Sequence, residues 1–262
     1  METRDLENER VKRLLGKYKK MVFFSILIIG LSISLTGCTS GKYKTKPDYK
    51  ITEQVTQSFM DAYMQGDLNK AMSHVAEDAI LSTDSGQMQG KATIAEMLQL
   101  NIDKQNKMEI AEKNKIDNSK MTLIIKNNIP LFQLAGVDVI KTKEKFEVQD
   151  SKIVRWEIKH LKESVDLIEK MASGTTGLEA EVKDGQIVVT KVMLKTPAAY
   201  EEIKVGDVIL SINGTELKDM AHGAEEIPYR LIGEPGSKVQ LEIKSGTEIM
   251  AVDIKRININ DL

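Results

Sequence analysis

An uncharged, mostly apolar segment near the amino terminus most limits what this chain of 262 residues can fold into. The segment runs from Met21 to Gly37 (MVFFSILIIGLSISLTG) and follows the basic stretch Lys17-Tyr18-Lys19-Lys20. A basic flank, an apolar core and small residues at the end are typical of a secretory signal, and the core is short for a stable membrane-spanning helix. We therefore expect residues 1–37 to be a signal peptide with a long leading region, and the rest of the chain to be exported.

The only cysteine of the chain follows this segment directly. Leu35-Thr36-Gly37-Cys38 resembles the lipobox of bacterial lipoproteins, in which small residues precede a cysteine. The resemblance implies that the sulfur of Cys38 carries a diacylglyceryl group, and two acyl chains hold a protein stably on a bilayer. We expect a lipid-anchored protein on the extracytoplasmic face of the cell membrane, with residues 38–49 as the lipidated cysteine and its tether. The alternative is an uncleaved amino-terminal anchor with an inert cysteine.

The composition excludes several classes of site. One Cys and three His exclude a disulfide framework and any metal site built mainly from Cys and His. The net charge of −2 gives no reason to expect nucleic acid as a partner. Residues 1–37 hold seven basic and four acidic side chains. Residues 38–262 therefore hold 30 basic and 35 acidic side chains, a net charge of −5. Such an acidic protein is not held on anionic lipid by its overall charge, so the lipid must anchor it.

No catalytic or cofactor motif is visible in the sequence. It contains no G-x-S-x-G, H-E-x-x-H, P-loop or G-x-G-x-x-G pattern. We therefore expect no cofactor, no bound metal and no catalytic residue, and we predict that the protein is not an enzyme.

Residues 50–163 have the periodicity of helices followed by strands. Val55, Phe59, Ala62 and Tyr63 share one face of a helix, whereas apolar residues alternate in segments 121–125, 140–148 and 154–158. The pattern predicts an α+β domain in which a curved antiparallel sheet wraps over the helices.

The stretch FMDAYMQGDLNKAMSHVAEDAILSTDSGQMQGKATIAEML resembles the SnoaL-like or nuclear-transport-factor-like superfamily. The resemblance implies a cone-shaped domain with a cavity, which in some members does chemistry through Asp, Tyr or His. Strand and helix periods place Tyr63, Glu144, Trp156 and His160 where they would line such a cavity, and burial would raise the pKa of a glutamate there. The alternative is that Glu144 lies near solvent and that Trp156 and His160 are core or dimer contacts.

Residues 174–259 are rich in turns and β-branched residues and follow a linker at 164–173 with helical spacing. The order of motifs resembles a small β-rich PDZ domain of the kind found in HtrA-type and carboxyl-terminal processing proteases. The matching residues are Gly177-Leu178, Thr196-Pro197-Ala198, Gly206-Asp207, Ile212-Asn213-Gly214 and the stretch GEPGSKVQL from Gly233 to Leu241.

This resemblance implies peptide binding by addition of a strand to the sheet edge. Backbone N–H groups of the loop Thr176-Gly177-Leu178-Glu179 would hold the ligand carboxylate, with residues 178–182 as the edge. The peptide-binding candidates are therefore Thr176, Gly177, Leu178, Glu179, Ala180 and Val182, together with Ile227 and Leu231 on a facing helix within residues 219–232. Two features depart from the family pattern. Glu179 would repel a carboxylate unless it points away, and Pro228 would kink or shorten the helix.

Together these features predict a non-catalytic, membrane-anchored module that binds protein or peptide tails, as an adaptor or regulator of a protease or envelope complex. Two alternatives remain open. One is small-molecule binding or isomerase/cyclase-like activity in the cavity of the first domain. The other is a scaffold that forms a homodimer through the first domain and presents paired PDZ grooves.

Overall fold

The computed structural model describes residues 45–261, so the predicted signal peptide, Cys38 and the first part of the tether lie outside the described residues. The described chain forms two compact units. The sheet unit contains residues 45–129 and 139–165, and the carboxyl-terminal unit contains residues 130–138 and 166–261. Within residues 45–261, no helix is long and apolar enough to cross a membrane.

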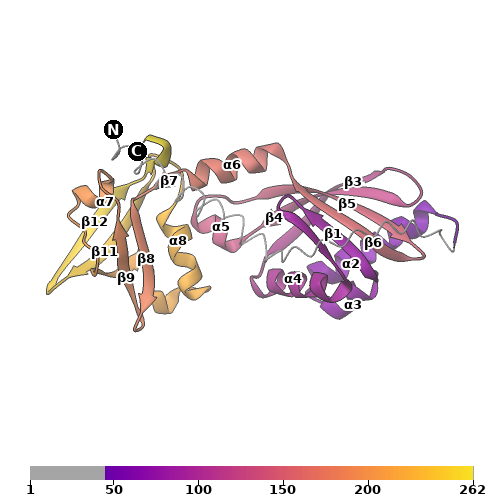
Figure 1. Ribbon diagram of the computed structural model, residues 1–262, viewed down its shortest axis with the longest axis horizontal. Helices are drawn as coiled ribbons and strands as arrows, with labels where there is room; N and C mark the ends of the chain where they lie inside the picture. The colour runs from indigo at the N-terminus through magenta and orange to yellow at the C-terminus, as the bar shows by residue number, and fades with distance from the viewer. Residues whose placement is uncertain (1–44, 262) are drawn as a thin grey trace, which may run out of the picture. The chain divides into compact units, whose positions relative to one another are not determined.

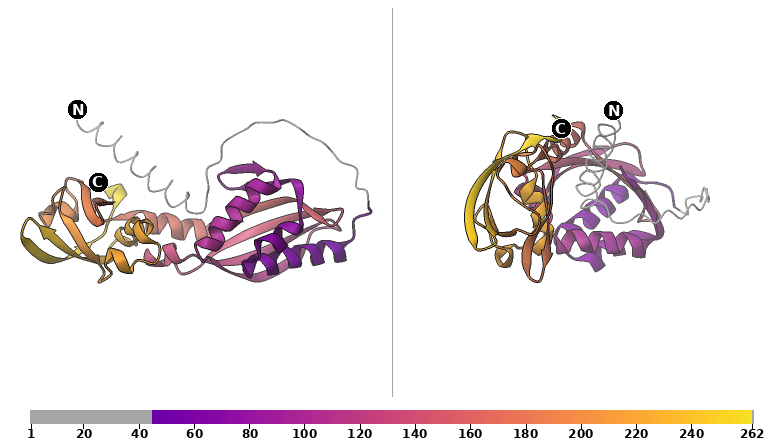
Figure 2. Two further views of the ribbon diagram at one scale, coloured as in Figure 1. Left: turned by 90° about the horizontal axis from the view of Figure 1, so that it is seen from below. Right: turned by 60° about the vertical axis from the view of Figure 1, so that its left-hand side comes forward.

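Three helices of the sheet unit lie on one face of its sheet (Figures 1 and 2). They are α2 (Tyr49–Met64), α3 (Leu68–Ser73) and α4 (Lys91–Asp103). The side chain of Asp48 accepts a hydrogen bond from the backbone N–H of Lys50 (2.9 Å) and so caps α2. Asp67 caps α3 in the same way through the N–H of Lys70 (3.0 Å). The Gly66-Asp67 pair therefore separates the two helices.

The sheet of this unit has six strands in the order β2-β1-β6-β5-β4-β3. They are β1 (Val75–Thr83), β2 (Gly86–Gln89), β3 (Lys107–Lys115), β4 (Lys120–Asn128), β5 (Ile140–Gln149) and β6 (Lys152–His160). The predicted α+β fold with a curved sheet is confirmed (Figure 2). One pair, β1 with β6, is parallel rather than antiparallel. These two strands are far apart in sequence, so no hairpin fixes their relative direction.

Aromatic side chains fill the space between the sheet and α2. The rings of Phe146 and Trp156 stack with centroids 5.4 Å apart, and the ring of Phe59 meets that of Trp156 edge-on at 5.2 Å. The ring centroids of Tyr63 and Phe59 lie 6.1 Å apart. All four side chains are buried, so the centre of the unit is packed with aromatic rings.

The carboxyl-terminal unit is built on a five-stranded antiparallel sheet in the order β12-β11-β10-β9-β8 (Figure 1). Its strands are β8 (Leu178–Lys183), β9 (Gln186–Val192), β10 (Val208–Ile212), β11 (Lys238–Ser245) and β12 (Glu248–Lys255), and a separate pair joins β7 (Gly174–Thr175) to β13 (Ile257–Asn258). The helices are α5 (Pro130–Leu134), α7 (Pro197–Tyr200), α8 (Glu226–Leu231) and the short 3₁₀ turns η1 (Leu217–Asp219), η2 (Gly223–Glu225) and η3 (Ile259–Asp261).

Helix α6 (Lys162–Ala172) contains the predicted linker 164–173 except its last residue, and the border between the two units lies within this helix. Segment 130–138 groups with the carboxyl-terminal unit, although the sequence pattern places it within 50–163. Phe132 of α5 and Tyr229 of α8 are both buried, and their rings lie 5.9 Å apart. A contact between residues this distant in sequence leaves no local pattern in the amino-acid sequence. The predicted domain boundaries 50–163 and 174–259 otherwise stay predictions.

Candidate functional site

Strand β8 is one of the two outermost strands of its sheet and pairs with β9. Helix α8 lies beside β8 (Figure 1). An outer strand next to a helix is the arrangement that strand addition by a peptide requires. The predicted peptide-binding residues therefore gather at one place in the carboxyl-terminal unit, although the sequence separates β8 from α8 by more than forty positions.

The loop that precedes β8 is held by threonine side chains. Gly177 has a φ of 85°, and a Cβ added to it would lie 2.1 Å from Oγ1 of Thr196. Its N–H donates to Oγ1 of Thr175 (3.0 Å), and the N–H of Leu178 donates to Oγ1 of Thr176 (3.3 Å). Two of the amides predicted to hold a carboxylate therefore already have acceptors, and a carboxylate would replace hydroxyl oxygens as their acceptor.

The apolar residues predicted to line the groove are buried. Leu178, Ile227 and Leu231 belong to one hydrophobic cluster, and none is more than 4% exposed. Ala180 is partly buried against the same cluster, whereas Val182 is 37% exposed. In this structure α8 is therefore packed onto β8, and a ligand side chain that entered the cluster would have to separate them.

The two departures from the family pattern have structural answers. Glu179 lies opposite Lys191 in the ladder and its carboxylate is 3.0 Å from Nζ of Lys191, so its charge is balanced within the sheet. Pro228 is the third residue of α8, where the backbone N–H has no partner within the helix. It is accommodated because α8 begins at Glu226 and has only six residues, and a 3₁₀ turn precedes it.

Arg256 is a buried residue that the sequence reasoning missed. Its guanidinium donates to the carbonyl oxygens of Arg230 (2.7 Å), Leu231 (3.0 Å) and Lys238 (2.9 Å), and to Oγ of Ser237 (3.0 Å). Arg256 thus holds the carboxyl end of α8 against the loop that precedes β11. A lone arginine between strand residues gives no sign in the sequence of where its donors point.

The four cavity candidates of the sheet unit, Tyr63, Glu144, Trp156 and His160, line a single small cavity. Its volume is about 70 Å³. Polar residues from α4, from β4 and from the connections next to β1 and β3 add to its lining, namely Asp84, Asn101, Asn106 and Asn127. The cavity is much smaller than the roughly 300–1,000 Å³ typical of ligand pockets, because aromatic rings fill the centre of the unit.

Glu144 is buried and carries hydrogen bonds to both of its oxygens. Oε1 accepts from Oγ1 of Thr142 (3.0 Å) and Oε2 accepts from Nε1 of Trp156 (2.9 Å). Burial raises the pKa of Glu144 to about 7, although these two hydrogen bonds act to lower it. Burial also raises the pKa of Tyr63, whose hydroxyl accepts a hydrogen bond from Nδ2 of Asn101 (3.2 Å).

His160 joins β6 to the turn between β1 and β2. Its Nδ1 lies 2.6 Å from Oδ2 of Asp84, and its backbone N–H donates to the same oxygen (2.9 Å). Nε2 of His160 and Oδ1 of Asn106 are both buried without a hydrogen-bond partner among the described residues, and both residues line the cavity. Sequence reasoning missed Asp84, which lies in the Gly-containing turn Thr83–Gly86 and is 76 positions from His160. Residues 45–261 hold no group of three or more His, Cys, Asp or Glu side chains that could bind a metal ion.

Comparison with known proteins matches residues 166–244 to the PDZ domain family. Two curated relatives are named "Probable CtpA-like serine protease". The one from Staphylococcus aureus is 34% identical over 84 residues, which is 32% of this chain and 16% of the relative. The one from Staphylococcus saprophyticus is 32% identical over 101 residues, which is 38% of this chain and 20% of the relative. The matches thus span a fifth or less of the length of these relatives.

Among solved structures, an NTF2-like protein of unknown function from Cytophaga hutchinsonii matches with 12% identity and a TM-score of 0.37. The match covers 47% of this chain and 98% of that one. An NTF2-like protein from Burkholderia xenovorans matches with 14% identity and a TM-score of 0.39, over 46% of this chain and 97% of that one.

Proposed function

We propose that this protein is a lipid-anchored, extracytoplasmic and non-catalytic module that binds protein or peptide tails along β8. The observation that carries the proposal is the position of β8, an outermost strand beside α8 within residues that match the PDZ family. The named relatives match this chain only over a short region, and we propose that this region does the same kind of work in both: holding a tail for a protease or an envelope complex.

The geometry supports a defined order of steps in peptide binding. A peptide would pair with the outer edge of β8. Its carboxylate would accept hydrogen bonds from the N–H groups of Gly177 and Leu178, in place of the threonine hydroxyls. Its last side chain would enter between Leu178 and Leu231 as α8 moves outward. Apolar contacts with the ligand then offset the loss of packing between the helix and the strand.

Blocking this edge tests the proposal. Ala180→Arg places a long charged side chain between β8 and α8, whereas Ala251→Arg places the same side chain on β12, the opposite edge of the sheet. A peptide library is presented to the full chain, and selected peptides are compared with their carboxyl-terminal amides. We expect Ala180→Arg and amidation each to weaken binding by about tenfold or more, with Ala251→Arg close to the wild type. Equal loss in both variants, or no selection by the wild type, overturns the proposal.

The lipid anchor has a separate test. In a bacterial host, the wild type should gain the mass of a diacylglyceryl group on Cys38 and should float with membranes, and Cys38→Ala should lack that mass. A wild-type protein without the added mass would show that this part of the proposal is wrong, and it would leave the peptide-binding part untouched.

A second candidate function is the binding of a small polar molecule in the cavity of the sheet unit. The observation that favours it is the pair of unpartnered polar atoms, Nε2 of His160 and Oδ1 of Asn106. The volume of about 70 Å³ suits a molecule of a few heavy atoms and not a polycyclic substrate, so we do not propose isomerase- or cyclase-like activity. Fragment screening by NMR on the full chain tests this candidate. Fragments that bind should shift the NMR signals of the His160 ring, and they should no longer bind to His160→Phe. Fragments that still bind to that variant would contradict this second candidate function.

A further inference from the structure

The face of the sheet that is turned away from the helices is strongly basic. In β5 the buried residues Thr142, Glu144 and Phe146 alternate with Lys141, Lys143 and Lys145, which therefore point to the opposite face. Pairing across the sheet extends this row of positive charge to both neighbouring strands. We call the result the lysine face, and it comprises Lys120, Lys126, Lys141, Lys143, Lys145, Arg155 and Lys159.

Like charges lie directly opposite each other on the lysine face. Lys143 pairs with Lys159 of β6, and Lys141 pairs with Lys126 of β4. Directly opposed like charges destabilise an antiparallel pair. A surface that keeps them is therefore suited to a partner that supplies negative charge.

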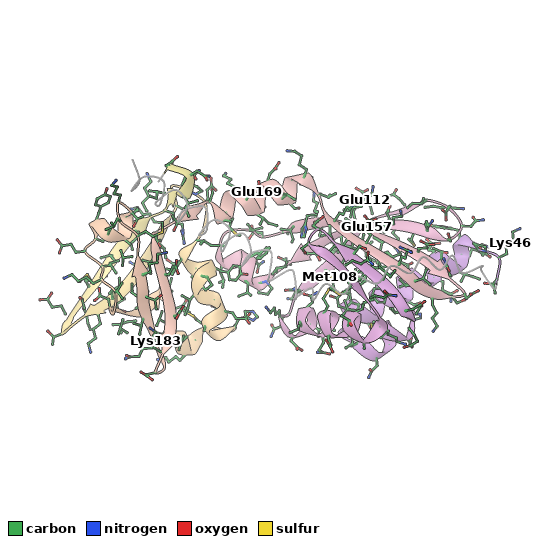
Figure 3. The ribbon with its side chains drawn as sticks, in the orientation of Figure 1. Lys46, Met108, Glu112, Glu157, Glu169 and Lys183 are labelled. Atoms are coloured by element: carbon green, nitrogen blue, oxygen red, sulfur yellow. The ribbon has the colours of Figure 1, made fainter. Side chains whose placement is uncertain are left out.

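Acidic neighbours offset only part of this charge. Four acidic side chains share the face, namely Glu109, Glu112, Glu147 and Glu157, two of which are labelled in Figure 3. Four lysines of the face lie within 4 Å of a carboxylate. The pairs are Lys126 with Glu109 (3.0 Å), Lys159 with Glu157 (2.7 Å), Lys141 with Glu163 of α6 (3.6 Å) and Lys120 with Glu147 (3.9 Å). Lys143 and Lys145 form no ion pair within residues 45–261.

The lysine face contrasts with the rest of the protein. Residues 45–261 hold 28 basic and 35 acidic side chains, a net charge of −7. Seven basic and four acidic side chains give the face a net charge of +3. A positive face on a negative protein orients the molecule toward an anionic surface.

The described end of the tether lies at one end of the same strands. The backbone N–H and Oγ1 of Thr45 both donate to Oδ1 of Asp150, each at 2.9 Å, and Asp150 lies in the turn between β5 and β6. Lys46 marks this end in Figure 3. Six residues lie between Cys38 and Thr45, and the seven residue-to-residue steps span at most about 25 Å. A lipid on Cys38 would therefore keep these strands close to the bilayer.

We propose that the lysine face binds the anionic headgroups of the bilayer that holds the lipid anchor. The inference rests on the anchor in the proposed function, and it goes beyond it by assigning a membrane-facing surface. The lysine side chains approach the headgroups when the strands lie along the membrane plane, and the short tether keeps the local concentration of lipid high. A second copy of the chain fits this face poorly, because it would place lysines against lysines.

Labelling of lysine amines on vesicles tests the proposal. The thiol of Cys38, the only cysteine, is coupled in the full chain to a maleimide lipid, which supplies the anchor whether or not cells attach one. Vesicles contain either 30% phosphatidylglycerol in phosphatidylcholine or phosphatidylcholine alone, and a water-soluble reagent acetylates exposed lysines. On anionic vesicles we expect Lys143, Lys145 and Lys159 to react at least about fivefold more slowly than on neutral ones, and 0.5 M salt to remove the difference.

Two double variants separate this face from overall charge. Lys143→Glu with Lys145→Glu should abolish the protection of Lys159, whereas Lys183→Glu with Lys244→Glu, the same charge change in the carboxyl-terminal unit, should retain it. Equal protection on both kinds of vesicle overturns the proposal. So does protection without vesicles that grows with protein concentration, which would identify a second copy as the occupant. Because the coupling is chemical, these outcomes do not depend on lipidation in the cell.

Discussion

At the scale of single residues, the setting of the Glu144 carboxyl group differs strongly from its setting in an unfolded chain. Its side chain is buried beside the rings of Phe146 and Trp156, and the pKa is raised from 4.5 to about 7 by burial. Between these two pH values the folded protein holds a proton that the unfolded chain has released. The free energy of unfolding must therefore fall as the pH rises from about 4.5 to 7, and it should change little from this source above that range.

Replacing this carboxyl group should remove the effect. In the wild type the free energy of unfolding should decrease by about 3 kcal/mol between pH 4.5 and 7, and we expect this decrease to be much smaller in Glu144→Gln. The amide can still accept from Nε1 of Trp156 and can donate to the hydroxyl of Thr142. Urea unfolding at pH 5 and pH 8 measures the difference. Glu147→Gln, a substitution on the open face of the same strand, is the control, and equal slopes for wild type and Glu144→Gln would contradict the prediction.

Gly177 offers a second prediction at this scale. Gly177→Ala would force a left-handed φ on a side-chain-bearing residue and push a methyl group into Thr196, so we expect a loss of about 2–4 kcal/mol. Gly185→Ala is the matched control, because Gly185 has a φ of 74° but nothing within 4 Å of an added Cβ. It should cost only about 1 kcal/mol. Chemical unfolding compares the two, and equal losses would show that Thr196 does not restrict the loop.

At the scale of secondary-structure elements, the wall of the proposed groove depends on α8, which is too short to be stable alone. Its six residues are held by Arg256 at the carboxyl end and by the packing of Ile227 and Leu231 on β8. The position of α8, and so the width of the groove, is therefore set by contacts from other elements rather than by the helix itself.

Removing the arginine should loosen this helix. Arg256→Leu removes the guanidinium that donates to the carbonyl groups of Arg230, Leu231 and Lys238, and the bond to Leu231 is buried. We therefore expect a loss of about 2–4 kcal/mol and faster hydrogen exchange in α8. Lys255→Leu, an exposed neighbour on β12, should leave exchange in α8 unchanged. Unchanged protection of α8 in Arg256→Leu would show that its donors do not hold the helix.

At the scale of the whole molecule, the units do not follow the order of the sequence. Segment 130–138 lies between β4 and β5 in the chain but belongs to the carboxyl-terminal unit, where Phe132 packs on Tyr229. Cutting the chain at the predicted border after residue 163 would therefore place these two buried rings on different fragments.

Two phenylalanine substitutions should affect different units. Phe132→Ala should destabilise the carboxyl-terminal unit by about 3 kcal/mol and speed hydrogen exchange in α8, with little effect on β6. Phe146→Ala should do the reverse, because Phe146 stacks on Trp156 in the sheet unit. Exchange measured by mass spectrometry on both variants distinguishes the units. Faster exchange in β6 than in α8 for Phe132→Ala would contradict the assignment of segment 130–138.

Features that depend on neighbouring residues could be predicted from the order of amino acids alone. Helical spacing placed Tyr63 on an inward face, strand alternation placed Glu144 with Phe146, and turn motifs indicated the order of strands in the region that matches the PDZ family. These features are local, because periods of 3.6 and 2 residues are fixed by backbone geometry. The signal peptide and the lipid on Cys38 remain predictions of the same local kind.

Contacts between distant residues, by contrast, came only from the folded structure. Folding brings Asp84 to His160, Arg256 to the end of α8 and Phe132 to Tyr229, and it aligns lysines of neighbouring strands into one face. It also packs Leu178, Ile227 and Leu231 together rather than leaving them open to a ligand. None of these contacts follows from a local pattern, since each depends on the register and packing of segments that are far apart in the chain.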